Sequence, residues 1–200
     1  MDNAVNIGVL ELERIRNPFA GKPEKKADMI NLAGIIEDSV VDGPGVRCVV
    51  FVQGCPHNCE GCHNKKEQDF AGGRFVDINK VAEKIIKAKT SKVTFSGGEP
   101  FCSAGELVQI ADIVSRKKDI EIFTYTGYTY EELIEAAEKD RDIYNLLCAT
   151  NYLVDGKFEI AKKTMNSFYR GSSNQRILDI TCYPNSKNSR VIQTKEELYC

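Results

Sequence analysis

Three cysteines stand close together in the sequence, at Cys55, Cys59 and Cys62, with the spacing Cys-x3-Cys-x2-Cys. Thiolates this close can wrap a single compact metal centre. Structural zinc sites and electron-carrying iron–sulfur clusters ordinarily use four protein ligands, and this loop has three. A cube of four irons held by three thiolates leaves one iron without a protein ligand, and an open metal position indicates reaction rather than scaffolding. The spacing therefore predicts a reactive iron–sulfur centre.

Two other interpretations of this loop remain open at this point. A zinc site would take His57 or His63 as its fourth ligand, and three buried cysteines would bind no metal. Pro, Asn and Gly crowd the segment Gly54–Asn64, which favours an irregular loop that wraps a ligand. The other five cysteines are scattered, and such cysteines are most often small buried residues: Cys48, Cys102, Cys148, Cys182 and Cys200.

The elements that must position this loop alternate between strand and helix patterns. Residues 46–52 form an apolar, β-branched run typical of a strand buried on both faces. Further strands are predicted at 93–96 and 120–125, and a last one that ends at Leu153-Val154. Helices with one apolar face are predicted around 78–86, from 104 and from 130, the last two opened by capping boxes at 103–106 and 129–132. This βαβ series predicts a mostly parallel sheet.

The length of 200 residues limits the architecture that this series can form. Eight βα units usually take about 250 residues, so a closed barrel does not fit. We expect an α/β fold, as an incomplete, open parallel β/α barrel or a short doubly wound sheet. Weak periodicity and early Pro and Gly residues make residues 1–29 an N-terminal extension, residues 30–182 the domain, and residues 183–200 a C-terminal tail.

Every unusual loop follows the C-terminal end of a predicted strand. These loops are Gly54–Asn64, Gly97–Pro100, Thr126–Tyr128 and Asp155–Lys157. The carboxyl ends of parallel strands share one edge of a sheet, where ligands bind. The sequence therefore predicts that four distant loops converge on one site.

Composition excludes several classes of function. Lys and Arg number 27 against 29 Asp and Glu, for a net charge of −2, so a dominant nucleic-acid partner is not expected. No run of eighteen apolar residues is present, which argues against a membrane span. The polar N-terminus lacks a signal-peptide core. We expect a cytoplasmic protein that binds neither nucleic acid nor membrane.

Two motifs together resemble the radical S-adenosylmethionine enzymes. The first is the cysteine triplet, and the second is Ser96-Gly97-Gly98-Glu99-Pro100, which resembles the Gly-Gly-Glu-Pro motif of that family. The resemblance implies that Cys55, Cys59 and Cys62 bind one 4Fe-4S cluster, whose open iron chelates S-adenosylmethionine.

The same resemblance implies which residues bind the cosubstrate. The loop Gly97–Pro100 would contact its amino group, since two glycines permit close approach and Glu99 suits a cation. Gly61 stands where many members have an aromatic residue, so adenine contacts would come from His63 or from backbone. The expected binding residues are Gly61, Cys62, His63, Gly97, Gly98, Glu99, Pro100 and Thr126. No catalytic residue is expected beyond the cluster and the cosubstrate.

Further motifs narrow the resemblance to one branch. Asp42–Arg47 and Cys62-His63-Asn64 look like the glycyl-radical-enzyme activases. Together with Tyr125–Tyr128, Leu153–Phe158 and Arg170–Gln175, they resemble the activators of anaerobic ribonucleoside-triphosphate reductase. Each also has a plainer interpretation: Arg47 as an ordinary paired or solvated charge, Asp155 and Lys157 as strand-end caps, and Arg170–Gln175 as a polar turn.

The resemblance implies a specific reaction. A one-electron donor such as flavodoxin reduces the cluster, S-adenosylmethionine is cleaved, and the adenosyl radical takes hydrogen from a glycine of the large reductase subunit. The alternatives are an activase for another glycyl radical enzyme such as pyruvate formate-lyase, a radical enzyme with a small-molecule substrate, and a non-catalytic iron–sulfur electron carrier. An incomplete barrel favours a protein substrate, because its lateral opening admits a loop.

Overall fold

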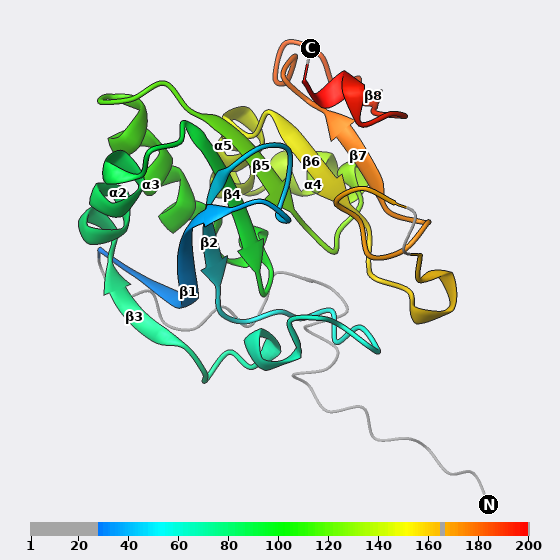
Figure 1. Ribbon diagram of the computed structural model, residues 1–200, viewed down its shortest axis with the longest axis horizontal. Coiled ribbons are helices and arrows are strands. Elements are labelled where there is room, and N and C mark those ends of the chain that lie inside the picture. The colour runs from blue at the N-terminus through cyan, green and yellow to red at the C-terminus, as the bar shows by residue number, and fades with distance from the viewer. Residues whose placement is uncertain (1–27, 165–166, 200) are drawn as a thin grey trace, which may run out of the picture.

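The computed structural model of the chain describes residues 28–164 and 167–199. Within them, eight strands form one sheet in the order β3-β1-β2-β4-β5-β6-β7-β8 (Figure 1). The strands are β1 (Met29–Ser39), β2 (Arg47–Val52), β3 (Arg74–Asp77), β4 (Lys92–Gly97), β5 (Glu121–Tyr125), β6 (Tyr152–Asp155), β7 (Arg176–Asp179) and β8 (Arg190–Val191). β3 and β8 are the two edges, so the sheet is open as predicted.

The centre of the sheet is parallel and its flanks are antiparallel. β2, β4, β5 and β6 pair in parallel. β1 pairs antiparallel with β2 and β3, and β7 with β6 and β8. The prediction of a mostly parallel sheet is therefore right for the strands that carry the unusual loops and wrong for the flanks. For the flank at β1 the reason is that the short connection 40–46 joins β1 to β2 without a helix, which only an antiparallel neighbour permits.

The described residues contain four α-helices. They are α2 (Ile78–Lys87), α3 (Ala104–Ser115), α4 (Tyr130–Ala137) and α5 (Arg141–Ala149). The predicted capping box at Thr129–Glu132 is present at the start of α4. The one predicted at Ser103 is wrong, because a 3₁₀ turn at Pro100–Ser103 leads directly into α3 and Ser103 makes no capping bond. α5 was not predicted from the sequence, and Asp140 caps it through its side chain.

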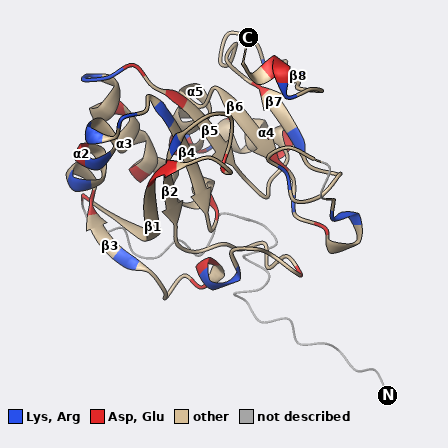
Figure 2. Ribbon diagram, in the orientation of Figure 1, with Lys and Arg blue, Asp and Glu red and all other residues tan. Residues whose placement is uncertain are grey.

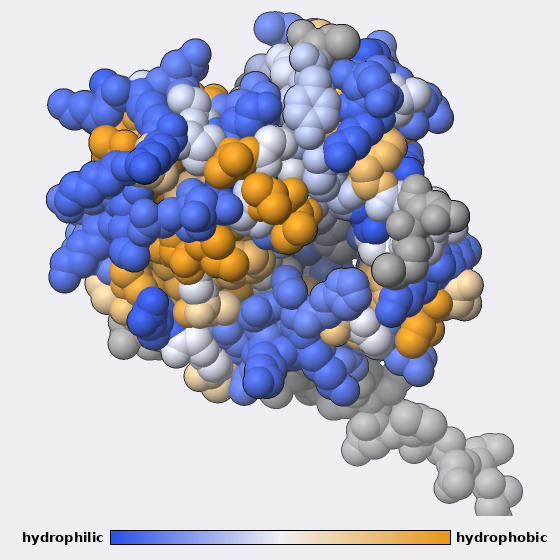
Figure 3. All heavy atoms as spheres, in the orientation of Figure 1, coloured by the Kyte–Doolittle hydropathy of each residue, from blue (hydrophilic) through white to orange (hydrophobic). Residues whose placement is uncertain are grey.

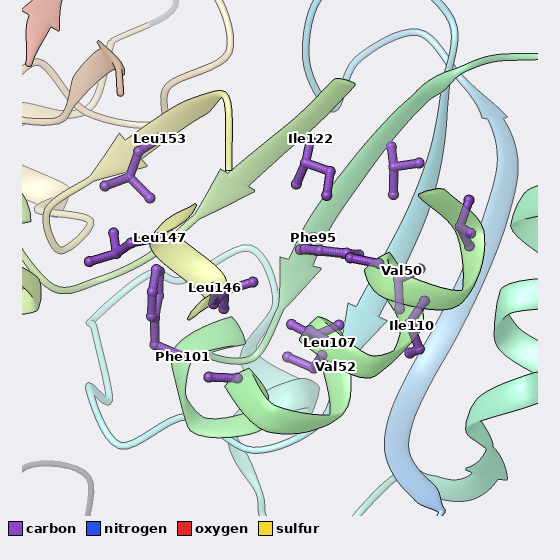
Figure 4. Packing of buried hydrophobic residues seen from close by; sticks show 14 of the residues in the cluster. Val50, Val52, Phe95, Phe101, Leu107, Ile110, Ile122, Leu146, Leu147 and Leu153 are labelled. Atoms are coloured by element: carbon purple, nitrogen blue, oxygen red, sulfur yellow. The ribbon is translucent and has the colours of Figure 1, made fainter. Parts of the chain in front are cut away.

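One face of the sheet packs against these helices. Alternate strand residues such as Val50, Phe95 and Ile122 point to this face and are almost fully buried, as the two-residue period of a strand requires. Figure 4 shows them meeting Leu107 of α3 and Leu146 of α5. These helices do not cover the opposite face of the sheet.

The opposite face is partly covered by the end of the chain. Phe123, Val154 and Ile177 form a second apolar cluster with Ile192 and Leu198. Burial of these last two residues joins the segment 183–199 to the same sheet that carries the site. The N-terminal extension proposed for residues 1–29 lies outside the described residues, except that β1 begins at Met29.

Charged and apolar residues are unevenly spread over the surface. Acidic and basic residues both lie on the helices and turns, while β2, β4 and β6 are uncharged over most of their length (Figure 2). The connection between β1 and β2 exposes Val40, Val41 and Val46, and Figure 3 shows apolar side chains near the centre of the face on that side. No helix in the described part of the chain is long and apolar enough to cross a bilayer.

The scattered cysteines divide into two groups. Cys48 and Cys102 are buried, as expected of small apolar side chains, whereas Cys148 and Cys182 are exposed. The expectation of burial is therefore wrong for the last two. Cys200 lies outside the described residues.

Candidate functional site

The four unusual loops meet at one edge of the sheet, as predicted. Main-chain hydrogen bonds of 2.8–2.9 Å join them in two pairs: Gly98 N donates to Val52 O and Glu99 N to Gly54 O, while Thr126 N donates to Val154 O and Gly156 N to Tyr128 O. The Glu99 side chain links the two pairs, because it accepts from Gly127 N at 2.8 Å. In Figure 1 the cyan segment that follows β2 lies beyond the arrowheads of β2 and β4. The parallel centre of the sheet thus brings loops from four sequence regions together.

The cysteine loop is held at its start by main-chain bonds. Gly54 N donates to Glu67 O at 2.7 Å, and Cys55 N donates to Gln68 O at 3.0 Å. The 3₁₀ turn at Lys65–Gln68 therefore folds back to support the strand end from which the first cysteine projects. This support fixes where the loop leaves the sheet.

The three thiols are partly buried neighbours. Burial raises the pKa of Cys55 to about 12, with further increases from Glu99 and from the other two cysteines. Burial also raises the pKa of Cys59, against a hydrogen bond from the Phe158 amide that lowers it. Both shifts favour the protonated thiols of Cys55 and Cys59, and metal binding to cysteine releases such protons.

The cysteine loop offers three thiols as possible ligands. In the described part of the chain, no three His, Cys, Asp or Glu side chains gather closely enough to hold a single metal ion. The nearest further cysteine beyond the Gly97–Pro100 loop, Cys102, is buried and hydrogen-bonded to the Tyr128 side chain. The three thiols on the loop are free and partly exposed, and thiolates are the ligands that hold iron–sulfur clusters.

Glu99 is the centre of the site's polar network. Its carboxylate is fully buried and lies within hydrogen-bond distance of four protein donors. Oε1 accepts from Thr126 Oγ1 at 2.9 Å and from Phe101 N at 3.1 Å. Oε2 accepts from Gly127 N and from His57 Nε2, both at 2.8 Å. Because a carboxylate has about four acceptor positions, a cationic ligand would have to replace one of these donors.

The remaining expected binding residues lie around the same loops. Gly98 passes so close to the cysteine loop that an added Cβ would stand 2.3 Å from Gly54 O, so this glycine serves loop-to-loop contact. Gly97 O accepts from Asn64 Nδ2 at 3.2 Å. The buried Pro100 begins the 3₁₀ turn after Glu99. These residues shape the loop as much as they line it.

The end of the cysteine loop faces the loop after β6. Gly61 lies against Ile160 and Phe158. The exposed His63 ring has its centroid 6.0 Å from that of Phe158. Phe158 ends the string Leu153–Phe158, but no contact at the site was predicted for it, nor for His57 and Asn64 as connectors, because each contacts a partner distant in sequence. The Cys-His-Asn string was the available signal for Asn64.

Secondary motifs at the site are held mainly by structural contacts. Asp155 is buried, accepts from Tyr130 N at the start of α4, and pairs with Arg176. The string Arg170–Gln175 folds on itself, with Gln175 Oε1 accepting from two of its amides. Gln175 Nε2 donates to Gly156 O and Asn174 Nδ2 to Lys157 O, so the string braces the loop after β6.

Comparison with known proteins agrees with this arrangement. A family model of a 4Fe-4S single cluster domain matches residues 41–178. The anaerobic ribonucleoside-triphosphate reductase-activating protein of Pasteurella multocida (strain Pm70) is 36% identical over 153 residues, which cover 72% of this chain and 94% of that protein. The protein of that name from Escherichia coli (strain K12) is 34% identical over 147 residues, covering 68% and 90%. The one from Enterobacteria phage T4 is 32% identical over 144 residues, covering 68% and 86%.

These matches cover most of the relatives' length, and the family model spans both the cysteine triplet and the loops that converge on it. The chain therefore belongs to the anaerobic ribonucleoside-triphosphate reductase-activating proteins and carries a 4Fe-4S single cluster domain.

Proposed function

We propose that this protein activates an anaerobic ribonucleoside-triphosphate reductase by generating a glycyl radical on its large subunit. The observation that carries the proposal is the three-thiol loop beside the buried Glu99 loop, at the edge where parallel strands end. Family membership favours this target over pyruvate formate-lyase, because the relatives are named for the reductase.

Cys55, Cys59 and Cys62 would hold the 4Fe-4S cluster, leaving one iron for S-adenosylmethionine. When bound and reduced by a one-electron donor such as flavodoxin, the cluster supplies the electron that breaks a carbon–sulfur bond of S-adenosylmethionine, giving methionine and an adenosyl radical that takes a hydrogen atom from glycine. The protein's own part is to bind and orient, since the cofactor carries the hard chemistry.

The residues around the site have distinct parts in that orientation. The main chain of Gly97–Pro100 would meet the methionine end, because the Glu99 carboxylate is already occupied by protein donors. Thr126 would act through Glu99, to which its hydroxyl donates. His63 and Gly61, beside Phe158, would border the adenine. These assignments rest on which loops adjoin the thiols.

The finer fold assignment follows from the same proposal. The parallel strands β2, β4, β5 and β6 with helices on one face would form the incomplete β/α barrel of the radical S-adenosylmethionine type, within residues 30–182. The unclosed sheet would let a loop of the reductase reach the site from the side. We expect the protein to act in the cytoplasm, without nucleic-acid or membrane partners.

The test uses the full chain, reconstituted with iron and sulfide without oxygen. Incubation with S-adenosylmethionine, a reductant and the large reductase subunit should give a glycyl radical signal by electron paramagnetic resonance. Cys59→Ala should lose the visible absorbance of the cluster and the cleavage of S-adenosylmethionine. Cys148→Ala, which changes an exposed cysteine on α5, is the matched control and should keep both.

Three results would overturn the proposal. A radical on pyruvate formate-lyase but none on the reductase would select the other activase. Full cluster absorbance and cleavage in Cys59→Ala would remove the cysteine assignment. An electron carrier, by contrast, would show no spectral change when S-adenosylmethionine is added to the reduced protein.

A further inference from the structure

His57 is the inward-pointing side chain of an otherwise outward-facing segment. Its neighbours Pro56 and Asn58 are exposed, whereas its own side chain is only 5% exposed. Its Nε2 lies 2.8 Å from Glu99 Oε2. Because a carboxylate only accepts hydrogen bonds, Nε2 is the donor. The residue between the first two cysteines is therefore tied to the neighbouring loop.

The surroundings of the ring are shaped to receive it. An added Cβ on Gly127 would stand 2.3 Å from His57 Cδ2, so only glycine leaves room for the ring at that position. On another side the ring meets Tyr128 edge-on, with centroids 4.4 Å apart and planes at 70°. Such edge-to-face pairs favour one orientation of both rings. His57 thus has a hydrogen-bond partner, an aromatic partner and a fitted space.

The position of His57 in the network gives it a particular consequence. The three other donors to Glu99 come from Phe101, Thr126 and Gly127, which belong to the loops after β4 and β5. His57 is the donor that the cysteine loop supplies. Breaking this bond would free the segment between Cys55 and Cys59 from Glu99 while leaving all three thiols in the chain.

We propose that His57 is a positioning residue, which sets the orientation of the cysteine loop relative to the Gly97–Pro100 loop. It holds the segment between Cys55 and Cys59 against Glu99, and so would fix these two cysteines relative to the loop expected to receive S-adenosylmethionine. This inference rests on the proposed function. It assigns His57 no contact with metal, which distinguishes it from the zinc interpretation with His57 as a ligand.

The experiment compares two substitutions of His57 in the full reconstituted protein. His57→Leu removes the donor, and His57→Gln restores a side-chain N–H. Partners that orient metal-site residues commonly contribute about 10–100-fold to affinity or activity, so His57→Leu should bind S-adenosylmethionine about tenfold more weakly. It should also lose most of the change that S-adenosylmethionine produces in the paramagnetic resonance spectrum of the reduced cluster. His57→Gln should recover most of the affinity and most of the spectral change. The iron content of both variants should stay near that of the wild-type protein.

A second variant and a control separate positioning from general stability. Gly127→Ala keeps the histidine but displaces its ring, and should weaken the binding of S-adenosylmethionine as His57→Leu does. It therefore tests the inference independently if His57→Leu folds poorly. Thr150→Val removes buried hydrogen bonds to Thr124 and Leu146 away from these loops. It should lower the unfolding temperature without altering affinity for S-adenosylmethionine.

Three results would overturn the inference. Unchanged affinity and spectra in His57→Leu, beside a wild-type protein that responds, would refute it alone and leave the proposed function standing. An equal loss of affinity in Thr150→Val would show that stability, and not position, is being measured. A wild-type protein that shows no response to S-adenosylmethionine would refute the proposed function, and this inference with it.

Discussion

The buried guanidinium of Arg47 allows a quantitative test of how side-chain hydrogen bonds stabilise the end of the sheet opposite the cysteines. Arg47 is fully buried at the start of β2 and donates to the Thr94 hydroxyl, to the carbonyls of Pro44, Val93 and Glu121, and to the Glu121 carboxylate, at 2.7–3.1 Å. Burial lowers its pKa against the opposing effect of Glu121. We predict that Arg47→Met unfolds the protein at a much lower temperature.

The size of the effect follows from what the substitution leaves behind. Removing one member of a buried ion pair lowers the free energy of unfolding by about 3–5 kcal/mol. Each buried polar group left without a hydrogen bond lowers it by about 1–3 kcal/mol. The Glu121 side chain is 31% exposed and can regain water, so most of the cost falls on the carbonyls of Pro44 and Val93. For a chain of this size, 1 kcal/mol shifts the midpoint by about 2–4 °C, so the expected fall is roughly 6–20 °C.

The assay is thermal unfolding of the reduced protein, followed by circular dichroism and accompanied by measurement of iron after reconstitution. Arg116→Met changes an exposed arginine and should shift the midpoint by less than about 2 °C. Iron content should be unchanged in both variants, because Arg47 lies at the start of β2 and the cysteines follow its end. A midpoint for Arg47→Met within about 2 °C of wild type would refute the reasoning.

Three further predictions concern other elements. Thr129→Ala should cost about 1 kcal/mol in denaturant unfolding, while Ser103→Ala should cost clearly less, because only the first makes its capping bond. Leu198→Ala should lower the free energy of unfolding by about 2–4 kcal/mol without loss of iron. If the segment around Leu198 were detached from the core, the free energy of unfolding would not change. A hydrogen bond from Arg176 lowers the pKa of Glu131, so its stabilisation is present above about pH 4.5 and lost as pH falls through the lowered pKa; Glu131→Gln should flatten that loss in unfolding measured against pH.

Much of the site was predictable because its signals are local. The cysteine spacing, the Gly97–Pro100 string and the four loops after strands each occupy a few consecutive residues. The parallel strands followed from apolar runs separated by helix patterns, and their register then placed the loops at one edge. The helix cap at Thr129 was also predicted from a short local pattern.

Other features depended on partners far along the chain. Arg47, which reads as an ordinary charge, becomes a buried hub only because β4 and β5 bring Thr94 and Glu121 beside it. Ser103 and Glu106 match a capping box, yet the preceding 3₁₀ turn prevents it. The antiparallel pairings at the flanks of the sheet could not be predicted from the residues of the short or irregular strands alone, because strand pairing is set by contacts between distant segments.

The amino-acid sequence by itself determined which groups this protein offers for chemistry: three thiols in one loop, a glycine-rich acidic loop, and strands that end where both loops begin. Only the tertiary structure decided how Glu99 is used. A carboxylate that seemed free to meet a cation is enclosed by His57, Phe101, Thr126 and Gly127. The reason is physical, because a buried carboxylate must be hydrogen-bonded, and its donors come from whichever loops the folded sheet brings to it.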